Sequence, residues 1–444
     1  MQVQEIQQTN LRTFIILWAT QILSVIGSEM TYFAITIWAW KVTGQATSLS
    51  LLLFFNQIPK LVTALFVGIF VDKWNRKRLM IIGDTATGIS TIAILLLFLT
   101  NQLEIWHIYV AAVVIGPFRH FQYFAFSTSI STLVPKQHLT RAVVMTEHIG
   151  EFTSNIIAPG LAGAIYSLIG LPGILTIDII TFLIAVSATW LVHIPQPLVS
   201  EVNQTKGKIW QDLTFGYRYI IKNSGLSVLL LFLVIFHFID AVTMGIHSPL
   251  ILARSANDSA VFAGVQSAIG LGGLVGALLL SIWGGFKRRI HGLLLGTIFY
   301  YGIMMVFSLV NLPSIWMITG FMAAVFWPWI TSSNQVIWLS KVPPDVQGRV
   351  FSTRYLLTLI ASPIGLAIAG PLADNFFQPA MMSEGILTPI FGSLFGTSSG
   401  AGLAVQYTLF SLLGAVLGLG GYTWRRLRNV ETIVPDYEDK YIKS

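Results

Sequence analysis

The sequence is poor in two residue classes, cysteine and charged residues. None of the 444 residues is Cys, which excludes disulfides, thiolate metal sites and cysteine nucleophiles but does not identify the cellular compartment. Only 10% of the residues are charged, whereas water-soluble proteins carry about 25%. With 54% hydrophobic residues and a mean hydropathy of +0.73, most of the surface must face lipid. The composition therefore predicts a polytopic membrane protein.

The sequence also lacks the motifs of nucleotide-driven pumps and membrane hydrolases. It has no Gly-x-x-x-x-Gly-Lys-(Ser/Thr) loop and no soluble domain for ATP, so any transport must draw its energy from a gradient. Its one Gly-x-Ser-x-Gly match, Gly396 to Gly400, lies in a stretch rich in Gly and Ser with no predicted strand before it, which the hydrolase motif requires, and it has no His-Glu-x-x-His. We therefore expect neither an enzyme nor a cofactor or metal. Residues 1–10 lack the charged start and cleavage site of a signal peptide, so we expect the first apolar run to be retained.

Twelve apolar runs are long enough to cross a bilayer, which predicts an all-α polytopic membrane protein with twelve transmembrane helices. An even number of spans puts both termini on the same side of the membrane. The runs are 12–40, 47–72, 79–100, 104–133, 141–169, 172–193, 225–252, 259–284, 290–310, 313–340, 348–373 and 401–424.

Basic residues gather in the connections on one side of these runs. A net charge of +7 and a pI near 9.5 are also found in nucleic-acid-binding proteins, but bases in short loops orient a protein in a membrane, so we expect no nucleic-acid partner. The opposite loops hold essentially Lys41 and Arg254. Both termini are therefore predicted to be cytoplasmic. The bases on that side are Arg76, Lys77, Arg78, Lys136, Lys206, Lys208, Lys287, Arg288, Arg289, Arg425, Arg426 and Arg428.

A polar stretch between Pro195 and Gly225 divides the runs into two sets of six. It mixes bases with aromatic residues, which indicates a cytoplasmic linker with an interfacial amphipathic helix. Val134-Pro135 followed by Arg141 recurs 208 residues later as Val342-Pro343 followed by Arg349. Two parallel six-helix repeats are therefore expected. The predicted parts are an N-terminal half (1–195), a linker (196–224), a C-terminal half (225–424) and a cytoplasmic tail (425–444).

The connection between the second and third runs gathers one acid and four bases. Bases are common in any short cytoplasmic loop, but Gly68 and Asp72, four residues apart, need a further reason. The pattern resembles the Gly-x-x-x-Asp-(Arg/Lys)-x-Gly-Arg-(Arg/Lys) loop of the major facilitator superfamily. Asn75 stands in place of the second Gly, and we expect it to tolerate the left-handed backbone of a tight turn. The resemblance implies a gating loop that consists of Gly68, Asp72, Lys73, Arg76 and Lys77.

The fifth run carries small residues at every fourth position before a proline. They are Gly150, Ser154 and Ala158, followed by Pro159 and Gly163. Such faces are common in membrane helices and allow close packing, and a proline bends the helix. The spacing is also similar to the antiporter motif that facilitator exporters carry in this helix, with Ala158 in place of a Gly. This resemblance implies efflux rather than uptake.

Charged residues within the runs are costly unless they face a cavity or a partner. We expect Asp178 and His247 to lie near helix ends, where a side chain reaches the interface. Four other residues lie too deep in their runs to reach the interface, and we expect them to couple transport to protons. They are Glu29, Arg119, Glu151 and Asp240. The candidates of this kind are Glu29, Lys60, Arg119, His120, Glu147, His148, Glu151, Asp178, His237, Asp240 and His247.

Arg119 and Glu151 are predicted to lie at similar depths. Arg119 is about 15 residues from the outer end of its run and Glu151 about 10 from the inner end of the next, and at about 1.5 Å per residue both come near the middle of a core about 30 Å thick. We predict that ionised Glu151 pairs with Arg119 and that protonation releases it. The alternative is a permanent structural ion pair.

Candidates for substrate contact occur in the fourth and tenth runs. Arg119 and Gln122 are similar to the Arg-x-x-Gln element of facilitators, although Tyr123 replaces the Gly that usually follows. A buried Arg keeps its charge, so it can tune an acid but cannot carry the proton. The aromatic run 326–329 is able to wall a pocket, although aromatic runs also face lipid. The cavity candidates are Gln122, Trp327, Trp329, Asn334 and Gln335.

Nearly the whole chain resembles the branch of the superfamily that contains bacterial macrolide exporters and the enterobactin exporter. The repeated Val-Pro elements and Gly27-Ser28-Glu29 carry this resemblance. It implies proton-coupled efflux of a small amphipathic molecule, such as a drug, macrolide or siderophore, across the bacterial inner membrane, by rocking of the two halves. A lysophospholipid flippase, an uptake porter and a non-transporting sensor are the alternatives. The expected partners are a small-molecule substrate, protons and lipid, and we expect a monomer.

Overall fold

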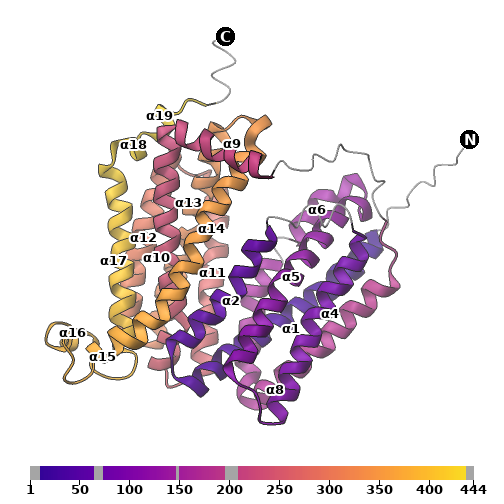
Figure 1. The fold of residues 1–444 in the computed structure, drawn as a ribbon, viewed down its shortest axis with the longest axis horizontal. Coiled ribbons are helices and arrows are strands. Elements are labelled where there is room, and N and C mark those ends of the chain that lie inside the picture. The colour runs from indigo at the N-terminus through magenta and orange to yellow at the C-terminus, as the bar shows by residue number, and fades with distance from the viewer. Residues whose placement is uncertain (1–10, 65–73, 147–149, 196–208, 437–444) are drawn as a thin grey trace, which may run out of the picture. The chain divides into compact units, whose positions relative to one another are not determined.

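The structure is a computed structural model that describes residues 11–64, 74–146, 150–195 and 209–436. Every regular element in these ranges is a helix, which confirms the predicted all-α class. Nine helices within them are long and apolar enough to cross a membrane. Contacts between Cα atoms divide the chain into two compact units (Figure 1). Unit 1 comprises Met1–Val42 and Leu52–Val202, and unit 2 comprises Thr43–Leu51 and Asn203–Ser444.

Unit 1 is a bundle of long helices in which α4 packs against both α5 and α8. The end of α1 and the first turns of α2 belong to unit 2. The helical elements of this part of the chain are α1 (Leu11–Thr43), α2 (Ala46–Ala64), α4 (Arg76–Leu99), α5 (Ile105–Leu133), the 3-10 turn η1 (Lys136–His138), α6 (Leu139–Val144), α7 (Gly150–Phe152), the π-helical turn η3 (Thr153–Ile157) and α8 (Ala158–Leu191).

The long helix α8 contains nearly all of the sixth predicted run and the last part of the fifth, from Ala158 onward. Gly170 has φ +62° and ψ −168°, a conformation that only glycine adopts readily, so the chain turns there although the elements on both sides are helical. Pro172 then begins the second part, where its fixed φ suits a helix start. The second and fourth runs lie on α2 and α5, which are not among the nine helices. Together with the turn in α8, these helices account for the described part of each of the twelve predicted runs. Residues 65–72 of the second run and 147–149 of the fifth lie outside the described ranges.

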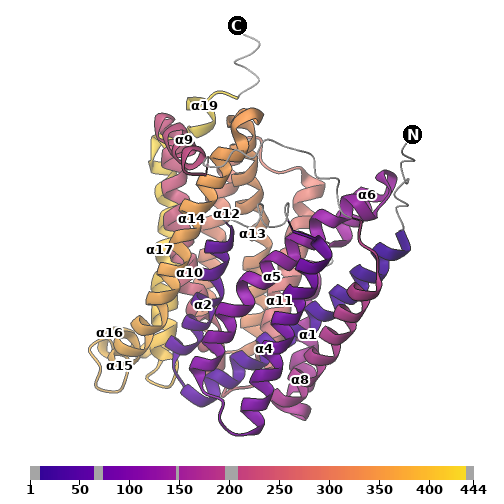
Figure 2. The same ribbon diagram turned by 45° about the vertical axis from the view of Figure 1, so that its right-hand side comes forward.

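Unit 2 is built from six long helices with smaller elements at both ends. α12 packs against α13 and α17, α11 against α13, and α10 against α14. Helices α9 and α19 lie at one end of this unit, and α15 and α16 lie at the other (Figure 1, Figure 2). The elements are α9 (Ile209–Lys222), α10 (Ser224–Arg254), α11 (Ser259–Trp283), α12 (Arg289–Leu309), α13 (Pro313–Lys341), α14 (Pro344–Leu372), the π-helical turn η4 (Ala373–Phe377), α15 (Gln378–Ala380), α16 (Thr388–Phe395), α17 (Ala401–Thr423), α18 (Arg425–Arg428) and α19 (Val430–Ile433).

The predicted interfacial helix is α9, and it packs on α14. The contact requires a glycine, because a Cβ atom on Gly216 would lie 2.6 Å from the carbonyl oxygen of Arg349. The Arg349 guanidinium lies 5.4 Å from the centre of the Phe215 ring, a cation–π distance. Tyr217 and Ile221 are exposed, as expected for a helix with one face at the membrane surface.

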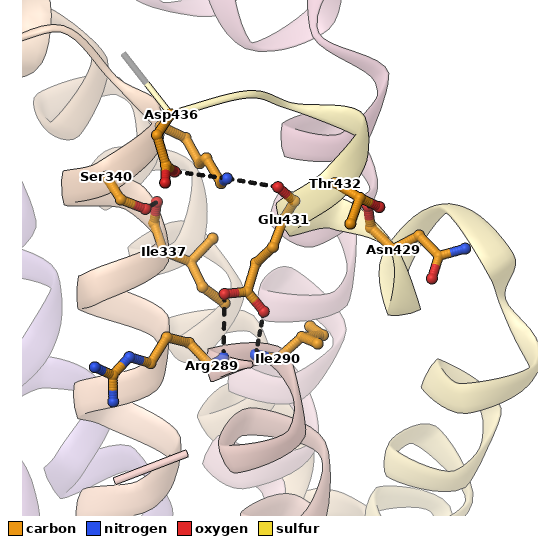
Figure 3. A network of polar contacts seen from close by, with 9 residues as sticks. Arg289, Ile290, Ile337, Ser340, Asn429, Glu431, Thr432 and Asp436 are labelled. Carbon is orange, nitrogen blue, oxygen red and sulfur yellow. Dashed lines mark hydrogen bonds and ion pairs between the residues drawn. The ribbon is translucent and has the colours of Figure 1, made fainter. Parts of the chain in front are cut away.

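The C-terminal segment closes the end of unit 2 that also carries α9. The carboxylate of Glu431 accepts hydrogen bonds from the backbone N–H groups of Arg289 (3.1 Å) and Ile290 (3.0 Å), at the start of α12. The Lys341 ammonium, with only 4% of its side chain exposed, donates to the Glu431 carbonyl oxygen (2.6 Å) and pairs with Asp436 (2.7 Å). Figure 3 shows this arrangement, in which the tail joins α12 to α13. We call these contacts the tail clamp.

The first turn of α2, which belongs to unit 2, is held by an acid from η4. The Asp374 carboxylate accepts from the N–H groups of Ala46 (3.0 Å) and Thr47 (2.8 Å) and from the Thr47 hydroxyl (2.6 Å). A negative group at a helix N-terminus satisfies donors that have no partner within the helix. Gly370 permits this approach, because a Cβ atom there would lie 2.6 Å from the backbone nitrogen of Thr47.

Candidate functional site

Four helices of unit 1 bring a set of polar side chains together inside the bundle. On α1, Gln21 and Ser28 are seven residues apart, and the same interval separates Asp84 and Thr91 on α4. Seven residues make about two helical turns, so each pair lies on one face, with its members about 10 Å apart along the axis. Two layers of contacts result. The whole set, which we call the polar network, consists of Gln21, Ser28, Glu29, Asp84, Thr91, Arg119, Gln122, Asp178 and Thr189.

The first layer is centred on Asp84. The Gln21 side-chain amide donates to Asp84 Oδ2 (2.9 Å), and its oxygen accepts from Gln122 Nε2 (2.6 Å). Thr189 Oγ1 lies 3.5 Å from the same Gln21 nitrogen. Asp84 is 8% exposed and Gln21 is 6% exposed, so both are buried. Gln21 of α1 therefore connects the Asp84 carboxylate to α5 and α8, and every donor in this layer is uncharged.

The second layer is centred on Asp178, and its two carboxylate oxygens have separate donors. Ser28 Oγ donates to Oδ1 (3.1 Å), and Thr91 Oγ1 donates to Oδ2 (2.9 Å). Asp178 is only 2% exposed. Its expected position near the interface is therefore wrong: helix α8 turns this carboxylate into the bundle, where hydroxyl groups satisfy it.

Next to this layer, Arg119 forms an ion pair with Glu29. The Arg119 charge also interacts with Asp178, and Lys60 of α2 lies close enough to interact with Glu29 and Arg119. The side chains of Glu29 and Arg119 are 23% and 37% exposed, less enclosed than Asp84 and Asp178. Arg119 thus has a partner on α1, whereas the sequence led us to expect one on the following helix. The Glu151 side chain lies outside what the structure describes.

Glycines allow the helices to approach closely around these side chains. A Cβ atom on Gly83 would lie 2.5 Å from Gln122 Cβ and 2.7 Å from the Phe118 carbonyl oxygen, and one on Gly27 would lie 2.9 Å from Asp178 Cα. Asp84, Arg119 and Gln122 line a cavity of about 30 Å³. A neighbouring cavity of about 60 Å³ also reaches Arg119 and Asp178. Both volumes are sufficient for water among polar partners.

Unit 2 has one deep acid among aromatic rings. Asp240 lies on α10, and its buried Oδ1 has no hydrogen-bond partner among the described residues. Tyr300, Tyr301 and Tyr407 lie near enough to interact with its charge. The Trp327 ring is 5.4 Å from the Tyr300 ring, measured between centroids.

The other residues predicted to line a cavity in unit 2, Trp329, Asn334 and Gln335, have different surroundings. Trp329 packs against Trp283 (5.6 Å) and belongs to a second aromatic cluster, away from the Trp327–Tyr300 contact. Gln335 accepts from Arg354 Nη2 (2.9 Å), whereas Asn334 has a buried Oδ1 with no partner in the described part of the chain. The sequence run thus contributes to two separate aromatic groups.

His247 also differs from its expected place near a helix end. It is 4% exposed, and its Nδ1 lies 3.2 Å from the Tyr407 hydroxyl. Phe307 stacks on the imidazole at a centroid distance of 5.1 Å. Aromatic packing from α12 and α17 therefore holds this side chain in the interior of unit 2.

The family model described as Major Facilitator Superfamily matches residues 17–366. The chain belongs to the major facilitator superfamily.

Curated relatives of this facilitator include exporters. The chain is 27% identical over 368 residues to macrolide efflux protein A of Streptococcus pyogenes, which covers 82% of this chain and 89% of the relative. It is 24% identical over 362 residues to the multidrug efflux pump Tap of Mycolicibacterium fortuitum, and this match covers 78% of this chain and 86% of the pump.

Solved facilitator structures share the fold. An inward-facing bacterial homologue of the human lysosomal transporter Spinster has a TM-score of 0.67 at 13% identity and covers 96% of this chain and 98% of its own. An inward-facing bacterial homologue of the iron transporter ferroportin has a TM-score of 0.66 at 14% identity, and the match covers 93% of this chain and 99% of the homologue.

Part of the facilitator loop is described. Arg76 is buried and its Nη1 donates to the Thr128 carbonyl oxygen (2.8 Å), while Lys77 Nζ donates to the Trp190 carbonyl oxygen (2.6 Å). We expected a left-handed backbone at Asn75, but the residue is extended, with φ −64° and ψ 117°. Its Oδ1 accepts from the Arg78 N–H (3.1 Å), so Asn is present here as the N-cap of α4. Gly68, Asp72 and Lys73 lie outside the described residues.

The antiporter-like segment of this facilitator contains a π-helical turn, η3, which includes Ser154. The N–H of Ala158 donates to the Thr153 carbonyl oxygen, five residues earlier, immediately before Pro159. A wider turn accommodates the proline ring, which would crowd the carbonyl four residues before it in an α-helix. Ala158, Pro159 and Gly163 are buried. A Cβ atom on Gly150 would meet nothing within 4 Å, so the tight packing expected at that position is absent among the described residues.

Sequence reasoning missed Asp84. It lies in the third predicted run and meets the same criterion as the other candidates, an acid within an apolar run. Gln21 had no such signal, because an uncharged amide in a membrane helix is common and its importance depends on what faces it.

Proposed function

We propose that the protein is a proton-coupled exporter of small amphipathic molecules. The observation that carries the proposal is the polar network, which encloses two buried acids and an arginine–glutamate pair within membrane-spanning helices of unit 1. Charge at such depth is costly, so a set of this size favours a role in ion coupling over simple packing. The export named for the relatives supports the direction, and macrolides are the first substrate class to test.

The ion pair supplies a fixed positive charge and an adjustable negative one. Arg119 cannot lose its proton in a protein, so it holds the charge that neighbouring acids balance. Glu29, Glu151 and Asp240 are the acids proposed from the sequence to exchange protons near it or in the other half. When an acid becomes neutral it no longer needs the guanidinium, and the free energy of this change biases the cavity toward one side of the membrane.

Substrate contact is proposed for the groups that offer both apolar walls and polar ends. In unit 2, Asp240 with Trp327 combines a carboxylate with an aromatic surface. In unit 1, Gln122 lines the cavity beside Arg119. Trp329, Asn334 and Gln335 complete the candidates, which suit a drug, a macrolide or a siderophore rather than a small inorganic ion.

The proposed location is the bacterial inner membrane, with both termini in the cytoplasm and the protein acting as a monomer. The excess of basic residues in the connections after even-numbered runs supports this orientation. In unit 2, the tail and the amphipathic helix α9 lie at the same end, which is consistent with one aqueous face for both (Figure 1).

Everted membrane vesicles test the function. An acidic interior should drive accumulation of labelled erythromycin, a macrolide, and a protonophore should abolish it. Accumulation that does not respond to the pH gradient would contradict proton coupling. Movement of labelled lysophospholipid between leaflets of liposomes, with no erythromycin transport, would identify a flippase instead, and a screen of siderophores would define the substrate range.

A further inference from the structure

We propose that Asp84 is the acid that carries the transported proton, an inference that rests on the proposed export function and names the coupling residue within it. Asp84 is buried and lines a water-sized cavity, and its hydrogen bond within the described residues comes from the Gln21 amide nitrogen, Nε2. In the part of the chain that the structure describes, Asp84 forms no ion pair.

The neighbouring acids are satisfied differently. Glu29 is balanced by the Arg119 guanidinium, and Asp178 accepts from two hydroxyls and also interacts with the Arg119 charge. A buried carboxylate without a cation is the costliest of the three to ionise, so it is the one that most readily takes up a proton from cavity water. Both ionic states are then accessible to Asp84 as the cavity changes its exposure to water.

Proton binding would reverse the role of Asp84 in its hydrogen bonds. An ionised carboxylate only accepts, which matches the Gln21 amide that donates to it. A protonated carboxyl also donates, and the oxygen of the same amide, Gln21 Oε1, is an acceptor in this layer that already accepts from Gln122. Donation to it therefore requires the Gln21 amide to turn, which breaks the link from α1 to α5.

This rearrangement reaches the ion pair through α5. Gln122 and Arg119 are one helical turn apart on the same face of α5. A change in the position of Gln122 therefore alters the position of Arg119 relative to Glu29. The members of the polar network that share the cavity with Asp84 are Gln21 and Ser28 of α1, Arg119 and Gln122 of α5, and Asp178 of α8. Glu29 is paired with Arg119, and Thr189 lies beside Gln21. Of the acids in the polar network, Asp84 is the buried one whose described hydrogen bond comes from an amide alone.

A spectroscopic experiment tests the titration without any substrate. Infrared difference spectra of the purified protein, recorded between acidic and alkaline pH, detect the carbonyl stretch of buried protonated carboxyl groups. We expect a band that disappears in Asp84→Asn and persists in Asp258→Asn, a matched change at an acid that caps α11 from the surface. A wild-type band that is unchanged in Asp84→Asn overturns the inference, whether or not the protein proves to be an exporter.

Transport provides the second test, in proteoliposomes with labelled erythromycin. One pH unit supports about tenfold accumulation per exchanged proton, so Asp84→Asn should lose about that factor while erythromycin exchange at equal pH continues. Asp84→Glu, which restores a carboxyl group, should recover gradient-driven accumulation. Full accumulation by Asp84→Asn overturns the inference. Absence of a gradient effect in the wild type overturns the export proposal instead, and the infrared band then decides on Asp84 separately.

Discussion

Removal of the Glu431 side chain should destabilise unit 2 through the tail clamp. Glu431→Ala leaves the first N–H groups of α12, at Arg289 and Ile290, without their carboxylate acceptor. Loss of a helix N-cap costs about 1 kcal/mol, and the negative charge at the helix N-terminus adds about 0.3–1 kcal/mol. The Lys341 contact to the backbone oxygen and to Asp436 does not depend on this side chain. We therefore expect a loss of about 1.5–2 kcal/mol.

Thermal unfolding of the detergent-purified protein measures this loss. At about 2–4 °C per kcal/mol for a unit of this size, the midpoint should fall by roughly 3–8 °C. Glu431→Gln keeps one acceptor oxygen and should fall by about half as much. Glu384→Ala removes an exposed acid of the same length and serves as the control. A midpoint for Glu431→Ala that equals the Glu384→Ala midpoint would show that water or another group replaces the cap at no cost, and the reasoning would be wrong.

Three further predictions follow from contacts in the two units. Asp374→Ala removes the acceptor for the Ala46 and Thr47 N–H groups and should lower the free energy of unfolding by about 1–2 kcal/mol, and amide exchange at these two residues that remains as slow as in the wild type would contradict this. Gly83→Val places a branched side chain against Gln122 and Phe118, so it should separate α4 from α5 and lower the free energy of unfolding by about 1–3 kcal/mol. It should also abolish gradient-driven erythromycin export, and normal export would refute the close contact. Glu151→Gln should keep gradient-driven export, because Arg119 already has Glu29 as its partner; loss of the gradient effect with retained substrate binding would restore Glu151 as the coupling acid.

Features that depend on local chemistry were predictable from the sequence. A span needs about 20 apolar residues, and this requirement can be counted along the chain, so the all-α class and the family followed without the structure. The polar stretch with aromatic residues likewise predicted the helix α9. Family resemblance at the Asp72 loop correctly indicated the facilitator superfamily, although a single position within it, Asn75, was misread as a turn residue rather than a helix cap.

Partner identity was decided only by the tertiary structure. Each residue along a helix rotates the side-chain direction by about 100°, so depth in the membrane does not tell which neighbour a side chain faces. Depth counting predicted Glu151 as a partner of Arg119 and did not predict Glu29, which the rotation of α1 brings to it. The Glu151 pairing stays a prediction, because its side chain lies outside the described part. The same uncertainty placed Asp178 at the interface instead of between Ser28 and Thr91.

The sequence by itself determined the all-α class, which segments are apolar enough to cross a membrane and which family the chain belongs to, because these follow from composition and spacing along the chain. The tertiary structure alone decided that Asp84 meets Gln21 and that Glu431 caps α12, contacts that join residues 63 and 142 positions apart. Such pairs depend on the rotation and register of helices that pack together, which glycines such as Gly83 set through close contact. No local pattern carries that information, because each helix could bury its apolar surface against several neighbours.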